Sequence, residues 1–134
     1  MTERDSERIA GAARRAALAQ GQQRAESVKA QRLIDEFVAS ARQRGLAPEP
    51  LRARLPGGAE VKTDKSGWYL RQDRSVAIGE GGEYYVLIVP GGLAERLRGA
   101  RLTGSPPPLV VGRGGPDGES GDLAEFLHRR LDQG

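Results

Sequence analysis

The sequence WYLRQDRSVAIGEGGEYYVLIVP (residues 68–90) contains three short apolar runs separated by two turn signals. The last run, Glu83–Val89, is rich in β-branched and aromatic residues, and the Pro-Gly-Gly sequence at 90–92 ends it. Its apolar side chains would point to both faces of a strand. A strand of that kind is usually central in its sheet and covered on both sides. We therefore expect an antiparallel meander that needs cover on two faces.

The register of this meander depends on its two turn signals, residues 73–74 and 81–82. If each forms a two-residue hairpin loop, Tyr69 and Tyr85 both lie opposite Ile78. This register would place Glu80 opposite Glu83, and a longer second loop would separate these two like charges. Because a slip of one residue exchanges the two faces of a strand, the sequence predicts the meander and leaves its register open.

Two amphipathic helices are expected to cover the sheet. The first spans residues 27–44, with Gly45 as its C-terminal cap. The second spans residues 122–131, and Asp122 and Glu125 have the spacing of a capping box. We expect the two helices to cover opposite faces of the sheet. Their apolar residues recur with the helical period: Leu33, Ile34, Phe37, Val38 and Ala41 in the first, and Leu123, Phe126, Leu127 and Leu131 in the second.

The remaining segments are assigned from their prolines, glycines and apolar runs. In order, they are a connector with one helical turn at 51–55, an edge strand at 59–63, a turn at 64–67, a two-turn helix at 93–99 and a strand at 109–111. That last strand would follow a right-handed crossover and lie parallel to the 83–89 run. The predicted fold class is α+β: a small antiparallel meander plus one further strand, packed by an N-terminal amphipathic helix and a C-terminal helix.

Apolar residues are spread unevenly along the chain. Leu, Ile, Val and Phe total 28, but residues 1–32 contain only Ile9, Leu18 and Val28. Such a segment has little to bury. We expect residues 1–26, called the arm below, to be flexible or conditionally helical and basic, and residues 27–134 to form a single compact domain.

Several classes of protein are disfavoured by composition. Cysteine is absent, which excludes disulfides, thiolate zinc sites and a cysteine nucleophile. No apolar run approaches the ~18 residues of a membrane span, and the first thirty residues show no secretory signal. We therefore expect a cytoplasmic protein without a membrane partner. Arg outnumbers Lys by 18 to 3, which is typical of a high-GC bacterial genome.

Catalytic and metal-binding patterns are not found. His128, the only histidine, follows Ser120 by eight residues, which is about 12 Å along one helix. The acids Asp117, Glu119 and Asp122 do not have the spacing of a calcium loop. We expect no catalytic residue, no metal and no cofactor, and we favour a protein that is not an enzyme.

The glycine-rich loop at 112–121 is the best candidate binding site. Glycines permit close backbone approach, the following helix start attracts anions, and an arginine can clamp a phosphate. Its G-x-G-x-x-x-G spacing is one residue too long for the dinucleotide fingerprint. A mobile turn before an acidic helix start explains the loop better, because Asp117, Glu119 and Asp122 place negative charge where a phosphate would lie. The candidate residues are Arg113, Gly114, Gly115, Asp117, Glu119 and Ser120.

Charge supplies a further candidate surface. Residues 1–54 carry eleven basic and seven acidic groups, a net of +4, and residues 55–134 carry a net of −1. An RNA-binding role would use Arg14, Arg15, Arg24, Arg42 and Arg44. Aromatic residues at 68–69 and 84–85 could stack bases on an exposed sheet, but core packing explains them better.

Three functional hypotheses follow. The first is a non-enzymatic protein-interaction module with an unidentified protein partner. The second is an RNA- or ribosome-associated protein that uses the arm, and the third is a phosphate- or nucleotide-binding protein that uses the 112–121 loop. A homodimer is expected if one sheet face lacks a covering helix, because a large exposed apolar patch usually marks an interface.

Overall fold

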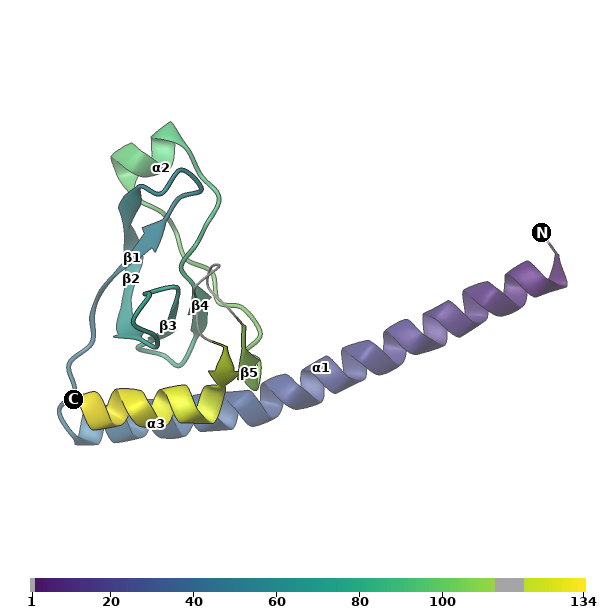
Figure 1. Ribbon diagram of the computed structural model, residues 1–134, viewed down its shortest axis with the longest axis horizontal. Helices are drawn as coiled ribbons and strands as arrows, with labels where there is room; N and C mark the ends of the chain where they lie inside the picture. Colours follow the sequence, from purple (N-terminus) through teal and green to yellow (C-terminus); the bar gives the residue numbers. More distant parts are fainter. Residues whose placement is uncertain (1, 113–119) are drawn as a thin grey trace.

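The computed structural model describes residues 2–112 and 120–134, and it confirms the α+β fold class (Figure 1). One sheet is antiparallel with the strand order β1-β2-β3-β4, and β5 and β6 form a separate two-stranded sheet. In chain order the elements are α1 (Glu3–Gln43), β1 (Glu49–Arg54), β2 (Glu60–Tyr69), β3 (Val76–Gly79), β4 (Tyr84–Val86), α2 (Leu93–Arg98), β5 (Val110–Val111), β6 (Gly121–Asp122) and α3 (Leu123–Gln133).

Helix α1 contains the expected amphipathic helix and the arm in one continuous element that runs far beyond the sheet (Figure 1). Thr2 and Asp5 form a capping box at its start. Gly45, which follows the C-cap Arg44, has φ +71°, a conformation that glycine adopts without strain. The helical state of residues 3–26 is therefore shown, while the flexibility expected for the arm stays a prediction.

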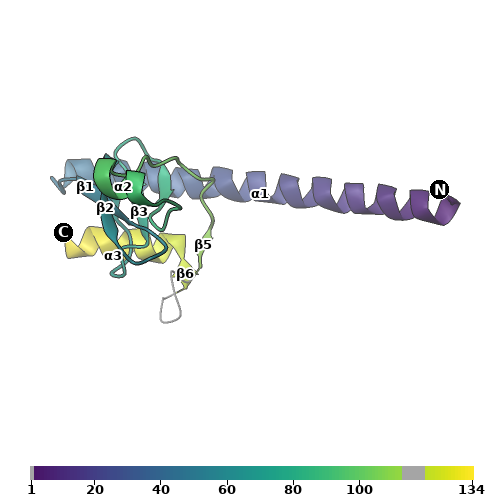
Figure 2. The ribbon, with the colours of Figure 1, turned by 90° about the horizontal axis from the view of Figure 1, so that it is seen from above.

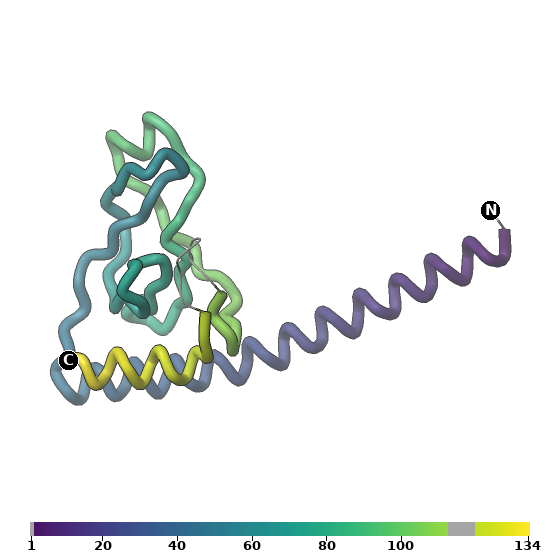
Figure 3. The backbone as a smooth tube through the Cα atoms, viewed as in Figure 1, coloured from purple at the N-terminus to yellow at the C-terminus, as the bar shows by residue number. Residues whose placement is uncertain are grey.

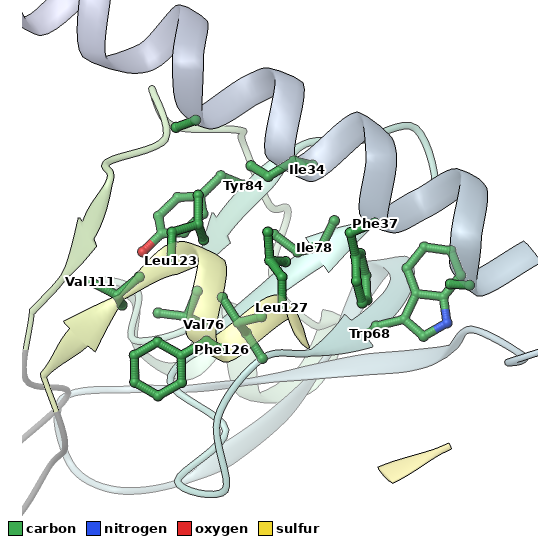
Figure 4. Close-up of a cluster of buried hydrophobic side chains, with 13 residues drawn as sticks. Ile34, Phe37, Trp68, Val76, Ile78, Tyr84, Val111, Leu123, Phe126 and Leu127 are labelled. Carbon is green, nitrogen blue, oxygen red and sulfur yellow. The ribbon is translucent and has the colours of Figure 1, made fainter. Parts of the chain in front are cut away.

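Helices α1 and α3 lie side by side and run in the same direction, so they cover the same face of the sheet (Figures 1 and 2). The expectation that they cover opposite faces is wrong. Trp68 joins this layer to the sheet. Its ring is perpendicular to that of Phe37, with the ring centroids 5.7 Å apart, and its Nε1 donates to Leu46 O at 3.0 Å. Figure 4 shows the cluster, which comprises Ala30, Ile34, Phe37, Ala41, Trp68, Leu70, Val76, Ile78, Tyr84, Val111, Leu123, Phe126 and Leu127.

The opposite face is buried because the sheet curls back on itself. The chain after β4 returns to β1, where Arg54 N donates to Leu87 O at 2.7 Å and Val89 N donates to Arg54 O at 3.0 Å. The second cluster comprises Leu51, Ala53, Leu55, Val61, Tyr69, Ala77, Tyr85, Leu87, Ala100 and Leu102. Both faces thus carry a buried cluster, as expected of the meander. The uncovered face that motivated a homodimer is not found among the described residues, and dimerisation itself stays a prediction.

Both hairpin registers differ by one residue from the two-residue-loop prediction. Tyr69 pairs with Ala77, and Ile78 pairs with Tyr84. The first loop is longer because it contains its own side-chain network, in which the Ser75 hydroxyl donates to Asp73 Oδ1 at 2.6 Å. In the second loop Gly82 has φ +90°, a conformation that favours glycine.

Strands β1 and β2 replace three other assignments. Residues 51–54 belong to β1 rather than to a helical turn. The strand expected at 59–63 is part of β2, which continues through the expected turn at 64–67, and its expected edge position is wrong because β2 lies between β1 and β3. Gly67 suggested a turn, but it lies in β2 opposite Gly79. A Cβ at Gly67 would be 2.0 Å from Ile78 O, so glycine here permits a close approach of two strands.

The strand at 109–111 is confirmed as β5, but its predicted parallel pairing with 83–89 is wrong. After α2 the chain returns along the sheet, where Ala100 N donates to Lys62 O at 2.9 Å and Ser105 N donates to Tyr84 O at 2.9 Å (Figure 3). The open edge of β4 is therefore occupied by the segment around Ser105 before β5 begins. The expected central place of the 83–89 run is also wrong, because β4 ends the strand order. The capping box predicted for α3 does not form, since Asp122 makes no side-chain cap hydrogen bond.

Candidate functional site

The arm is an exposed surface along its helical length. From residue 3 to residue 25 every side chain is exposed or partly exposed, including Ile9 at 59% and Leu18 at 67%. Hydrogen bonds with the Thr2 side chain and backbone lower the pKa of Asp5, and Asp5 also pairs with Arg8 at 2.7 Å. The arm is thus a capped helix, about 36 Å long at 1.5 Å per residue, that is presented to solvent.

The junction between the arm and the rest of α1, residues 26–31 (called the base of the arm), is fixed by contacts with the sheet and with the segment before β5. Glu26 Oε1 accepts from Leu109 N at 2.9 Å, and Gln31 Nε2 donates to Gly82 O at 2.8 Å. Ala30 is fully buried in the first core cluster. These contacts come from two separate segments, so they hold α1 in a defined direction relative to the sheet.

The five arginines proposed for RNA binding are not brought together. Arg14, Arg15 and Arg24 are exposed on the arm. Arg42 Nη2 donates to Glu80 O at 2.8 Å and Arg44 Nη1 donates to Leu131 O at 3.5 Å, both at the other end of α1. The rise of the helix separates Arg15 from Arg42 by about 40 Å. Only the three arm arginines lie in one stretch of α1, and the helical period places Arg15 and Arg24, nine residues apart, on opposite sides of it.

Charge on the arm is concentrated in one run. Residues 8–25 contain Arg8, Arg14, Arg15 and Arg24 and no aspartate or glutamate. A net charge taken over residues 1–54 conceals this run, because the acids lie on both sides of it. All the charged side chains in the middle of the arm are therefore positive.

The arm also continues the face by which α1 packs on the domain. Ala12, Ala16 and Ala19 each precede a buried residue (Ala30, Ile34 and Phe37, respectively) by 18 residues, or five turns at 3.6 residues per turn. The same side of the helix therefore carries the core contacts in one half and small, exposed side chains in the other.

A groove lies beside the base of the arm, between α1 and the prolines at 106–108. Its volume is about 890 Å³, and Val28, 53% exposed, contributes to its apolar lining. The three prolines precede β5 along the chain. Their position against α1 depends on the path of the chain after α2, which no local pattern indicates.

The candidate loop site falls mostly outside the described residues. Arg113, Gly114, Gly115, Asp117 and Glu119 all belong to residues 113–119, so their proposed role stays a prediction. Ser120, which is described, is exposed beside β6.

The aromatic residues considered for base stacking are core residues, as expected. Trp68, Tyr69, Tyr84 and Tyr85 are between 1% and 8% exposed. Burial raises the pKa of the Tyr84 and Tyr85 hydroxyls. None of these four rings is available to a nucleic acid on the surface.

Within residues 2–112 and 120–134, no group of three or more His, Cys, Asp or Glu residues could hold a metal ion. No helix in this part of the chain combines the length and the apolar character needed to cross a membrane. No protein-family model matches the chain, and comparison with curated proteins and with solved structures finds no match.

Proposed function

We propose that the protein is a non-enzymatic interaction module of the bacterial cytoplasm, whose contact surface is the arm and whose partner is a protein with an acidic surface. The observation that carries this proposal is the exposed first half of α1, fixed in direction by the contacts of Glu26 and Gln31. An ordered helix loses less conformational entropy on binding than a disordered segment does.

The charge of the arm supports an acidic partner. Residues 8–25, the middle of the arm, contain no carboxylates. Of the four arginines in this stretch, only Arg8 forms an ion pair with another described residue. Complementary charge steers association and fixes the register of a complex.

The shape of the arm supports a helical partner. Alanines at 12, 16 and 19 would let a second helix approach closely, as small side chains do in helix pairs. The groove between Val28 and the prolines at 106–108 could receive an apolar side chain at the end of such a helix.

Affinity capture from native lysate tests the proposal, with the full chain compared with residues 27–134. The informative variant is Arg14→Glu/Arg15→Glu/Arg24→Glu. Its matched control reverses three exposed arginines away from the arm, Arg96, Arg98 and Arg101. A protein retained by the full chain and the control, resistant to nuclease and lost with the arm variant, is the expected result. Equal recovery with all variants would contradict the proposal.

RNA binding is the second candidate, and the carboxylate-free run favours it. Because the sheet aromatics are buried, this RNA interface would consist of phosphate contacts from the arm. Fluorescence anisotropy with a single-stranded RNA would then show affinity that falls steeply with KCl, with a slope of about −0.7 per phosphate contacted. Binding that is absent at low salt, or unchanged in the arm variant, would exclude this candidate.

A further inference from the structure

A cavity of about 240 Å³ is lined by the end of α3 and by the 71–75 loop. The end of α3 lies beside the end of α1 that is away from the arm (Figure 1). Tyr69 and Phe126 form its aromatic walls, and among its described lining residues Glu49 alone is acidic. Its arginines come from two elements: Arg71 and Arg74 from the loop, and Arg129 and Arg130 from the last turns of α3. Four arginines around so small a space is an unusual concentration of positive charge.

Arg71 is built into the wall of the cavity. Its side chain is 4% exposed, Nη2 donates to Ser75 Oγ at 2.7 Å, and Nη1 donates to Gly112 O. Nε lies 3.7 Å from Asp73 Oδ1. Burial acts to raise the pKa of Asp73, but hydrogen bonds from Ser75 and the charge of Arg71 outweigh it and lower that pKa. Arg71 and Asp73 are thus a charge-balanced pair.

Arg74 reaches the cavity at a cost to the backbone. Its φ is +57°, the left-handed region that a residue with a Cβ avoids and that glycine would adopt freely. In this conformation its guanidinium lies 4.4 Å above the centre of the Tyr69 ring and 3.7 Å from Glu49 Oε1. Residues held in strained conformations are concentrated at binding and catalytic sites.

Arg130 lines the cavity from α3. Its Nε donates to Tyr69 O at 3.1 Å, which uses one of the five N–H donors of a guanidinium. Arg129 lies over the Phe126 ring at 5.4 Å. The contacts of these side chains with rings and backbone carbonyls fix their position, and they leave donors of Arg74 and Arg130 for a ligand.

We propose that this cavity binds the phosphoryl group of inorganic phosphate or of a small phosphomonoester, clamped between Arg74 and Arg130. The four arginines against Glu49 and Asp73 leave a net charge of +2, which matches a phosphate dianion. Guanidinium groups pair with phosphate oxygens in a bidentate geometry. The volume is below the ~300 Å³ of sites for larger ligands, which favours a phosphoryl group over a whole nucleotide.

A purely structural account explains some of the same residues, because cations in the last turn of a helix stabilise it. The two accounts differ in what Arg74 does. In either account Arg74→Gly relieves the strained φ and removes the contacts of Arg74 with Tyr69 and Glu49. If Arg74 has no ligand, the substitution leaves the response to phosphate unchanged. If Arg74 clamps a phosphoryl group, the substitution removes that response.

Thermal unfolding of the full chain in inorganic phosphate, against chloride at matched ionic strength, tests the proposal by mass action. Phosphate should raise Tm, and calorimetric titration should give an affinity that falls at least tenfold in Arg74→Gly and in Arg130→Gln. Arg96→Gln, an exposed site on α2, should behave as the unmodified chain. Phenyl phosphate in place of phosphate distinguishes an esterified ligand from the free ion by its higher affinity. Equal effects of phosphate and chloride, or an unchanged phosphate response in both cavity variants, would overturn the proposal.

Discussion

The two halves of α1 belong to one helix but have opposite surroundings. Residues 27–43 bury Ala30, Ile34 and Phe37 against the sheet and α3, whereas the arm carries exposed alanines at the positions five turns earlier. Helix formation in the arm therefore cannot depend on packing. It depends on propagation from the packed half, which adds a hydrogen bond per residue without the cost of a new nucleus.

Because of this difference, one helix has two separate roles, the stability of the domain and the presentation of an exposed surface. The packed half contributes to the stability of the domain, and the arm contributes a surface. Substitutions in the two halves should therefore change different measurements, and the predictions below are ordered by the expected size of their effect.

The largest contrast compares Phe37→Ala with Ile9→Ala. Phe37 is 2% exposed and contacts Trp68, so its truncation should lower the free energy of unfolding by about 3–5 kcal/mol. Ile9 is 59% exposed, and its truncation should change that free energy by no more than about 0.5 kcal/mol. Urea unfolding followed by the fluorescence of Trp68 measures both. Similar losses in the two variants would show that the arm packs on the domain.

The next contrast compares Gly67 in the sheet with Gly21 in the arm. Gly67→Ala places a Cβ 2.0 Å from Ile78 O, so it should lower the free energy of unfolding by about 1–3 kcal/mol or more. The same urea series measures this loss. A variant as stable as the original would contradict the close approach of β2 and β3 at this position.

In the arm, alanine in place of glycine should have the reverse effect. A Cβ at Gly21 meets nothing within 4 Å, so Gly21→Ala should stabilise the arm helix locally by about 1 kcal/mol. Circular dichroism should show greater helicity, while the unfolding midpoint of the domain stays unchanged. A shift of that midpoint would mean that the two halves of α1 unfold as one cooperative unit.

The smallest contrast concerns two carboxyls with lowered pKa values. A backbone hydrogen bond from Leu102 N lowers the pKa of Asp64, and hydrogen bonds with Thr2 lower that of Asp5. Because the folded pKa lies below the unfolded one, each contribution is present above pH ~4 and is lost as the pH falls through the folded value. Asp64→Asn should therefore reduce the acid dependence of domain unfolding slightly. Asp5→Asn should change only the helicity of the arm. Urea unfolding and circular dichroism measured as a function of pH would contradict these roles if Asp5→Asn changed domain unfolding and Asp64→Asn changed arm helicity.

Local patterns in the sequence were sufficient for the packed half of α1, for α3 and for the fold class. The apolar period of 33–41 and of 123–131 marks buried faces correctly, because helical contacts recur at fixed spacing. The same reasoning failed where contacts with residues distant in the sequence determine which residue a position requires. Gly67 indicated a turn, but its partner Gly79 and the carbonyl of Ile78 are what require it.

The second face of the sheet shows the same limit on a larger scale. The curl that joins residue 54 to residues 87–89, and the return of the chain along β2, bury the second cluster without any helix. Of the candidate site, the exposed arginines of the arm follow from composition. The remote positions of Arg42 and Arg44, the groove and the arginine-lined cavity depend on tertiary contacts that no local pattern encodes.

Amide hydrogen exchange along α1 tests the division of this helix most directly. In the isolated protein, amides of residues 30–43 should exchange with a protection close to the global stability, and amides of residues 6–25 should exchange orders of magnitude faster because they open locally. Equal protection along the whole of α1 would contradict the account, since the arm would then be stabilised together with the domain.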